Sequence, residues 1–63
     1  MQKLISLKTE TDITVFMRTD MISSFFYMKD KDITEVFVGP SAQLNVYHFP
    51  GDHTDRIINA IMG

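Results

Sequence analysis

The sequence predicts a small α+β protein with about five short antiparallel strands in one sheet and a single C-terminal helix. Three observations predict this fold. Apolar and polar residues alternate over most of the chain, glycine and proline interrupt the alternation, and the apolar period lengthens to about 3.6 residues near the C-terminus. We expect one β-rich domain over residues 1–63, whose sheet is either open or curled into a half-barrel.

Five stretches of the chain are expected to be strands, because their residues alternate and are rich in β-branched and aromatic types. These stretches are Leu4 to Lys8, Ile13 to Arg18, Met21 to Met28, Ile33 to Val38 and Leu44 to Phe49. Turn-forming residues separate them. The polar run at residues 9–12 predicts a hairpin between the first two strands, and Gly39-Pro40-Ser41 ends the fourth.

The last expected element is an amphipathic helix at about residues 52–62. Asp52 is suited to cap it, and Asp55 favours the positive N-terminal end. Its apolar stripe consists of Ile57, Ile58, Ile61 and Met62. A helix of about eleven residues is marginal in isolation, so it has to pack on the sheet.

Size and composition predict that the domain needs support. A domain of about 60 residues buries only about 60% of its unfolded surface. The chain has no cysteine and only two histidines, which excludes disulfides and the usual structural zinc sites. We therefore expect no cofactor and no metal, and self-association into a dimer or a larger symmetric oligomer as the stabilising device.

The net charge and the length of the apolar runs limit which partners and which cellular location we expect. Six basic and eight acidic residues give a net charge of −2 in a scattered pattern, which is not the footprint of a duplex DNA-binding protein. No apolar run approaches the roughly 20 residues of a membrane span, and no signal-peptide core follows the N-terminus. The expected location is the cytoplasm, with no membrane contact.

Successive side chains of a strand point to opposite faces of the sheet, and on this basis the strand residues separate into an aliphatic set and an aromatic set. The aliphatic set holds Ile13, Val15, Met17, Val36, Val38, Leu44 and Val46, and the aromatic set holds Phe16, Phe25, Tyr27, Phe37, Tyr47 and Phe49. One helix can cover only one face. The aromatic set is therefore expected to be an interface or ligand platform, with Phe37 and Tyr47 as anchors, or alternatively the internal core of a barrel.

Motifs that carry catalysis are missing, which predicts that the protein is not an enzyme. The three glycines are isolated and form no phosphate-binding loop, and no serine lies in a nucleophile elbow. A metal or hydrolase site could recruit His48, His53, Asp52 and Asp55. Their spacing matches no known motif and is better explained by a strand end, a turn and a helix cap.

An alternative function is the binding of nucleotides or single-stranded nucleic acid. Aromatic side chains on a sheet can stack bases, and Phe16, Phe25, Tyr27, Phe37 and Tyr47 are the candidates. The basic rim that such binding needs is thin, because only Lys8, Arg18, Lys29 and Lys31 could supply it. Nucleic acid is therefore the less favoured partner.

The order of elements resembles that of the short FlbD-type proteins of bacterial flagellar operons and related small bacterial and phage proteins. The likeness lies in the segments LISL at 4–7, TDMI at 19–22, EVFV at 35–38 and DRII at 55–58. The chain departs from the family at the turns, where residues 9–12, 39–41 and 50–52 replace Leu-Asn-Gly, Asn-Gly-type and Glu-Ser steps. The resemblance implies strands followed by a helix, and a non-enzymatic accessory protein.

These observations favour a small accessory or regulatory protein, bacterial or phage-encoded, that acts through protein–protein binding and associates with itself.

Overall fold

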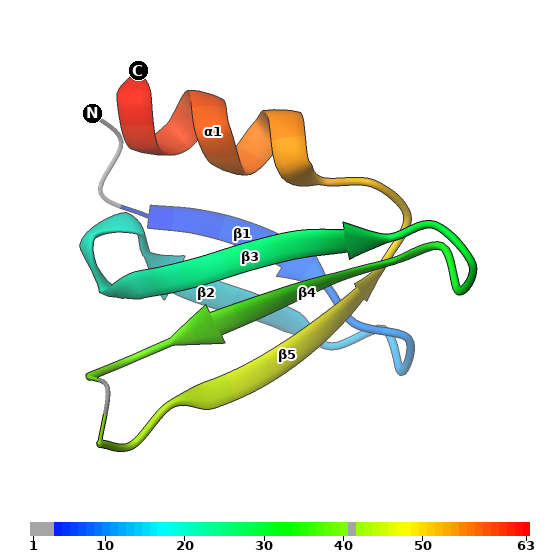
Figure 1. The fold of residues 1–63 in the computed structure, drawn as a ribbon, viewed down its shortest axis with the longest axis horizontal. Helices are drawn as coiled ribbons and strands as arrows, with labels where there is room; N and C mark the ends of the chain where they lie inside the picture. Colours follow the sequence, from blue (N-terminus) through cyan, green and yellow to red (C-terminus); the bar gives the residue numbers. More distant parts are fainter. Residues whose placement is uncertain (1–3, 41) are drawn as a thin grey trace.

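Five strands and one α-helix make up the computed structural model, which describes residues 4–40 and 42–63. The strands are β1 (Leu4–Lys8), β2 (Thr14–Arg18), β3 (Ile22–Met28), β4 (Ile33–Val38) and β5 (Asn45–Pro50), and the helix is α1 (Thr54–Met62) (Figure 1). A short 3₁₀ helix, η1 (Thr19–Met21), links β2 to β3. The predicted α+β class is confirmed; the expected turn residue Ser41 lies outside the described residues.

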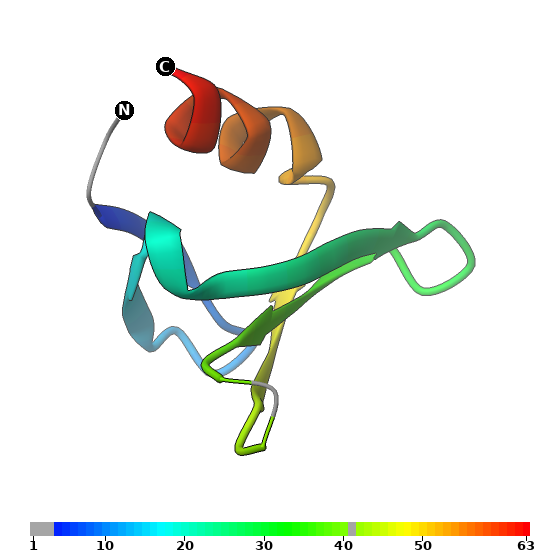
Figure 2. The same ribbon diagram turned by 60° about the vertical axis from the view of Figure 1, so that its left-hand side comes forward.

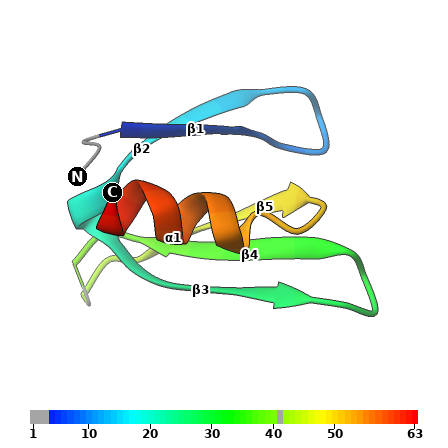
Figure 3. The same cartoon turned by 90° about the horizontal axis from the view of Figure 1, so that it is seen from above.

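The strands form two antiparallel sheets instead of the single sheet expected from the sequence. One sheet is the β1–β2 hairpin, and the other has the order β3-β4-β5. The division occurs at η1, because this helical turn redirects the chain before it re-enters a strand at Ile22. The hairpin and the three-stranded sheet flank the interior, and α1 lies over the opening between β1 and β3 (Figures 2 and 3).

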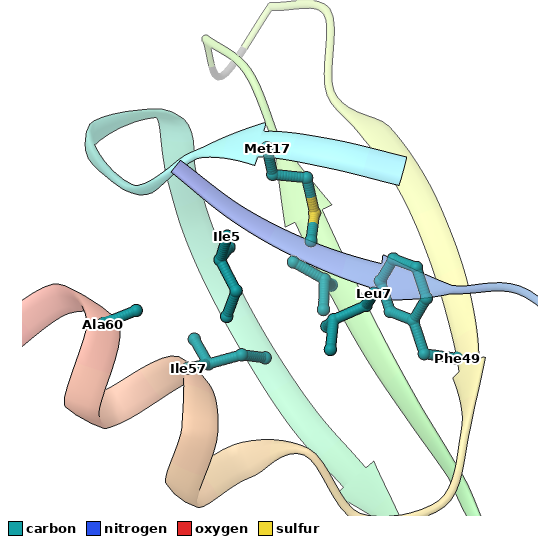
Figure 4. Packing of buried hydrophobic residues seen from close by; sticks show 7 residues of the cluster. Ile5, Leu7, Met17, Phe49, Ile57 and Ala60 are labelled. Atoms are coloured by element: carbon teal, nitrogen blue, oxygen red, sulfur yellow. The ribbon is translucent and has the colours of Figure 1, made fainter. Parts of the chain in front are cut away.

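The hydrophobic core lies between the two sheets and the helix. Its buried members are Ile5, Leu7, Met17, Val36, Phe49, Ile57 and Ala60. The side chains from the hairpin, from β5 and from α1 point toward one another (Figure 4). Four strands and the helix each supply one or two of these buried residues, whereas β3 contributes only Ile22 and Phe25, which are partly buried against them.

The helix begins at Thr54, two residues later than predicted. Its N-cap is His53 and not the predicted Asp52, which lies one residue earlier. Asp52 Oδ1 accepts hydrogen bonds from the Thr54 backbone N–H at 3.1 Å and the Thr54 hydroxyl at 2.6 Å.

Ile57 and Ala60 face the core, whereas Ile58 is 41% exposed. The predicted stripe was therefore wrong at two positions: Met62 is also exposed, at 80%, whereas Ile61 packs against the core as expected and Ala60 is an additional buried residue.

The turn after β4 requires a glycine. Gly39 has a φ of 117°, and a Cβ atom there would lie 2.9 Å from the backbone oxygen of Gln43. Its N–H donates to the Met21 carbonyl at 2.8 Å, which ties this turn to η1.

Candidate functional site

The aromatic residues do not share one face, so the predicted separation into an aromatic and an aliphatic face was wrong. In the register of the three-stranded sheet, Phe25 lies opposite Val36 and Val36 lies opposite Tyr47. Paired residues point to the same side of a sheet. The face of each residue depends on the pairing register, which the turns and a β-bulge near Ile22 and Ser24 set, and not on its number in the chain.

Four of the six predicted interface residues point inward. Phe49 is fully buried in the core, and Phe25 and Tyr47 are partly buried against it. Tyr27, opposite the buried Thr34, shares the inner face and donates its hydroxyl to the carboxylate of Asp32. Tyr47 is therefore not a surface anchor beside Phe37.

The two remaining residues point outward but lie on different sheets. Phe16 is 69% exposed on the hairpin, paired with Ser6. Phe37 is half-buried on β4, paired with Ser24 on one side and Val46 on the other.

The outer face of the three-stranded sheet is the clearest candidate surface. We define it by the residues whose register places them opposite the core side: Ser24, Phe26, Met28, Ile33, Glu35, Phe37, Val46, His48 and Pro50. Phe26, 43% exposed, contacts Phe37 with ring centroids 5.8 Å apart and planes inclined by 33°. Phe26 was absent from the predicted set, although adjacent strand residues such as Phe25 and Phe26 necessarily face opposite sides.

One polar pair interrupts this apolar face. His48 Nε2 and Glu35 Oε2 are 2.6 Å apart across β4 and β5, and the Glu35 side chain is 18% exposed. An ionised carboxylate only accepts hydrogen bonds, so Nε2 is the donor. The pair supplies a hydrogen-bond donor to a largely covered carboxylate.

β3 is one of the two edge strands of the same sheet; the other, β5, ends in Pro50. Among the described residues the one strand neighbour of β3 is β4, and seen from above no described strand lies beyond it (Figure 3). The strand reads ISSFFYM and contains no charged residue. Ser23, Ser24 and Phe26 are exposed along it. An edge strand without charge or proline is open to pairing with another chain.

The structure does not bring together the residues of the metal or hydrolase alternative. His48 bonds Glu35, His53 Nε2 lies 2.7 Å from the Pro50 carbonyl, and Asp52 Oδ1 accepts the N–H of Thr54. Among residues 4–40 and 42–63, no group of three His, Asp or Glu side chains could hold a metal ion.

Local hydrogen bonds shift the pKa values of two side chains, Tyr27 and Asp52. The hydrogen bond to Asp32 is the main cause that raises the pKa of Tyr27 above 10.0. The hydrogen bonds from the Thr54 hydroxyl and backbone N–H lower the pKa of Asp52 below 3.8. Tyr27 is partly buried and Asp52 is exposed, and each of these hydrogen bonds joins residues close together in the sequence around a turn.

No protein-family model, no curated protein and no solved structure matches the chain. The resemblance to FlbD-type proteins therefore stays a prediction. Within the described ranges, the structure has no helix that is long and apolar enough to cross a membrane.

Proposed function

We propose that this protein is a cytoplasmic, non-enzymatic accessory protein that acts by protein–protein binding, and that its first partner is a second copy of itself, paired along β3. The observation that carries the proposal is the uncharged free edge of β3 next to the exposed ring of Phe26. Edge strands with these properties pair readily, and soluble proteins normally protect them with lysine, proline or a covering element.

The sequence of β3 is complementary to itself. If two copies pair antiparallel about a two-fold axis through Phe25, Ser24 of each copy lies opposite Phe26 of the other. Both side chains belong to the outer face, so a small residue meets a large one. Phe25 of one copy then lies opposite Phe25 of the other on the inner side, and aromatic cross-strand pairs of this kind stabilise a sheet. No like charges oppose each other between residues 22 and 28.

The pairing would join the two outer faces into one surface. Two three-stranded sheets would become one sheet of six strands, with the Phe26–Phe37 contact of each copy near the two-fold axis. Such a surface could receive a further protein partner. An edge of five to seven residues is about 17 to 24 Å long and covers less than the roughly 800 Å² per partner of a typical stable complex. We expect a reversible dimer whose population depends on concentration.

Lysine substitutions on β3 test this proposal by sedimentation equilibrium. The wild type should show a mass that rises with concentration from 7.3 kDa toward twice that value. Ser24→Lys and Phe26→Lys should each raise the dissociation constant of the dimer at least about tenfold. The reason is that pairing of the two β3 strands would remove the charged lysine from water, which costs free energy.

Asn59→Lys is the matched control, because it adds the same charge at an exposed position of α1. Circular dichroism verifies that all three variants keep the fold. A monomeric wild type, or equal weakening by Asn59→Lys, would contradict the proposal.

A further inference from the structure

We propose a second binding site: the groove between β1 and the first turn of α1 binds a small molecule that carries a phosphate group. This inference does not rest on the pairing of β3, because no residue of β3 lines the groove. The end of β1 lies below the start of α1 in the view of Figure 1, and residues of both elements line the groove.

The groove is open, has a volume of about 600 Å³ and lies within the size range of small-molecule sites. Its lining residues are Ser6, Leu7, Lys8, Thr9, Thr14, Pro50, His53 and Arg56. The lining contains two permanent cations, an imidazole and three hydroxyls, and it contains no carboxylate. The whole chain has more acidic than basic residues, eight against six, so the positive charge of this lining is opposite in sign to the net charge of the chain.

The two cations are available to a ligand. Among the described residues, no carboxylate lies within ion-pair distance of Arg56. Lys8 pairs with Asp12 at 3.4 Å, but the two side chains are 68% and 84% exposed. Such an exposed ion pair contributes little to stability, so Lys8 can leave Asp12 and bind a more highly charged anion. Arg56 offers a planar fork of N–H donors that suits a phosphate, and Lys8 adds a point charge from the opposite wall.

His53 is held in the groove by its surroundings. Its backbone N–H donates to the Thr34 hydroxyl at 2.9 Å, and its ring makes an edge contact with Phe49 at 6.5 Å. Because the Pro50 carbonyl only accepts, Nε2 of His53 is the donor in their 2.7 Å hydrogen bond. The carboxylate of the neighbouring Asp52 accepts hydrogen bonds from Thr54.

The hydroxyls complete the site for phosphate oxygens. Ser6, two residues before Lys8, and Thr14, which pairs with Lys8, lie on the same outer face of the hairpin as Lys8. The Thr9 hydroxyl is already bonded to Thr11 and to the N–H of Ile13, so it shapes the wall. The apolar remainder, Leu7 and Pro50, leaves room for an uncharged part of the ligand.

Nuclear magnetic resonance titrations with inorganic phosphate and with ribose 5-phosphate, at constant ionic strength, test the site. Saturable shifts are expected at the amides of Lys8, His53 and Arg56. Arg56→Gln and Lys8→Gln should each weaken binding by about tenfold, the usual size of a charge-assisted contact. Tighter binding of ribose 5-phosphate would identify a phosphorylated metabolite, and equal binding would identify the free ion as the ligand.

Lys31→Gln is the control, because it removes the same charge from the exposed turn between β3 and β4. Phe26→Lys should leave phosphate binding unchanged, which separates this site from the proposed dimer interface. Shifts that never saturate, or the same loss in Lys31→Gln, would show general charge screening and overturn the proposal.

Discussion

The hydroxyl of Thr34 donates a hydrogen bond to the carbonyl oxygen of Gly51 over 2.7 Å, from the central strand β4 to the turn before α1. Thr34 is fully buried, and its oxygen also accepts the N–H of His53 at 2.9 Å. One buried hydroxyl thus satisfies a donor and an acceptor of the segment that places both the helix and His53.

Replacing this hydroxyl should destabilise the fold. Thr34→Val keeps the shape of the side chain but leaves the Gly51 carbonyl and the His53 N–H without these partners, which costs about 1 to 3 kcal/mol each. Urea denaturation measures the loss. Thr14→Val, at an exposed strand position, is the control and should change the free energy of unfolding by less than about 0.5 kcal/mol. Equal effects of the two substitutions would argue against the role of Thr34.

The docking of α1 depends on Ile57. Ile57 is 0% exposed and its neighbour Ile58 is 41% exposed, so the same truncation at the two positions separates packing from helix propensity. Ile57→Ala should cost about 2 to 5 kcal/mol. That is a large part of the roughly 3 to 9 kcal/mol expected for a chain of this length. Thermal unfolding followed by circular dichroism should show a much smaller effect for Ile58→Ala, and the reverse order would exclude this packing.

Acid should weaken the turn in which Asp52 accepts hydrogen bonds from Thr54, the first residue of α1. The pKa of Asp52 is lower in the folded chain than its ordinary 3.8, chiefly through the hydrogen bond from the Thr54 hydroxyl. Its contribution is therefore present above pH 3.8 and is lost as the pH falls through the folded value. Asp52→Asn keeps an acceptor but does not titrate. The free energy of unfolding should fall less steeply with acid in this variant than in the wild type, and parallel curves would refute the assignment.

The elements were predictable from the sequence because their signals are local. Alternation identified all five strands, and the change of period identified the helix to within two residues. The division into two sheets was not predictable in this way. It depends on η1 and on its tie to Gly39, which is a contact between residues 18 positions apart.

The candidate surface was predicted only in part for the same reason. Phe37 does face outward, but which partner shares its face depends on the register with β3 and β5. The inner pairing of Phe25 with Val36 and the exposure of Phe26 follow from that register and have no local signature. The role of Thr34 was also not predicted, because nothing in the sequence around a strand threonine indicates that its hydroxyl bonds a distant turn.

Backbone hydrogen exchange in β3, measured by nuclear magnetic resonance at high and low protein concentration, tests the proposed pairing most directly. In an antiparallel ladder, alternate N–H groups bond the neighbouring strand and the others point to the free edge. Within residues 24–28, the groups that bond β4 should be protected at both concentrations. The edge-pointing groups should become protected only at high concentration. Rapid exchange of these groups at both concentrations would contradict the pairing of β3 with a second copy.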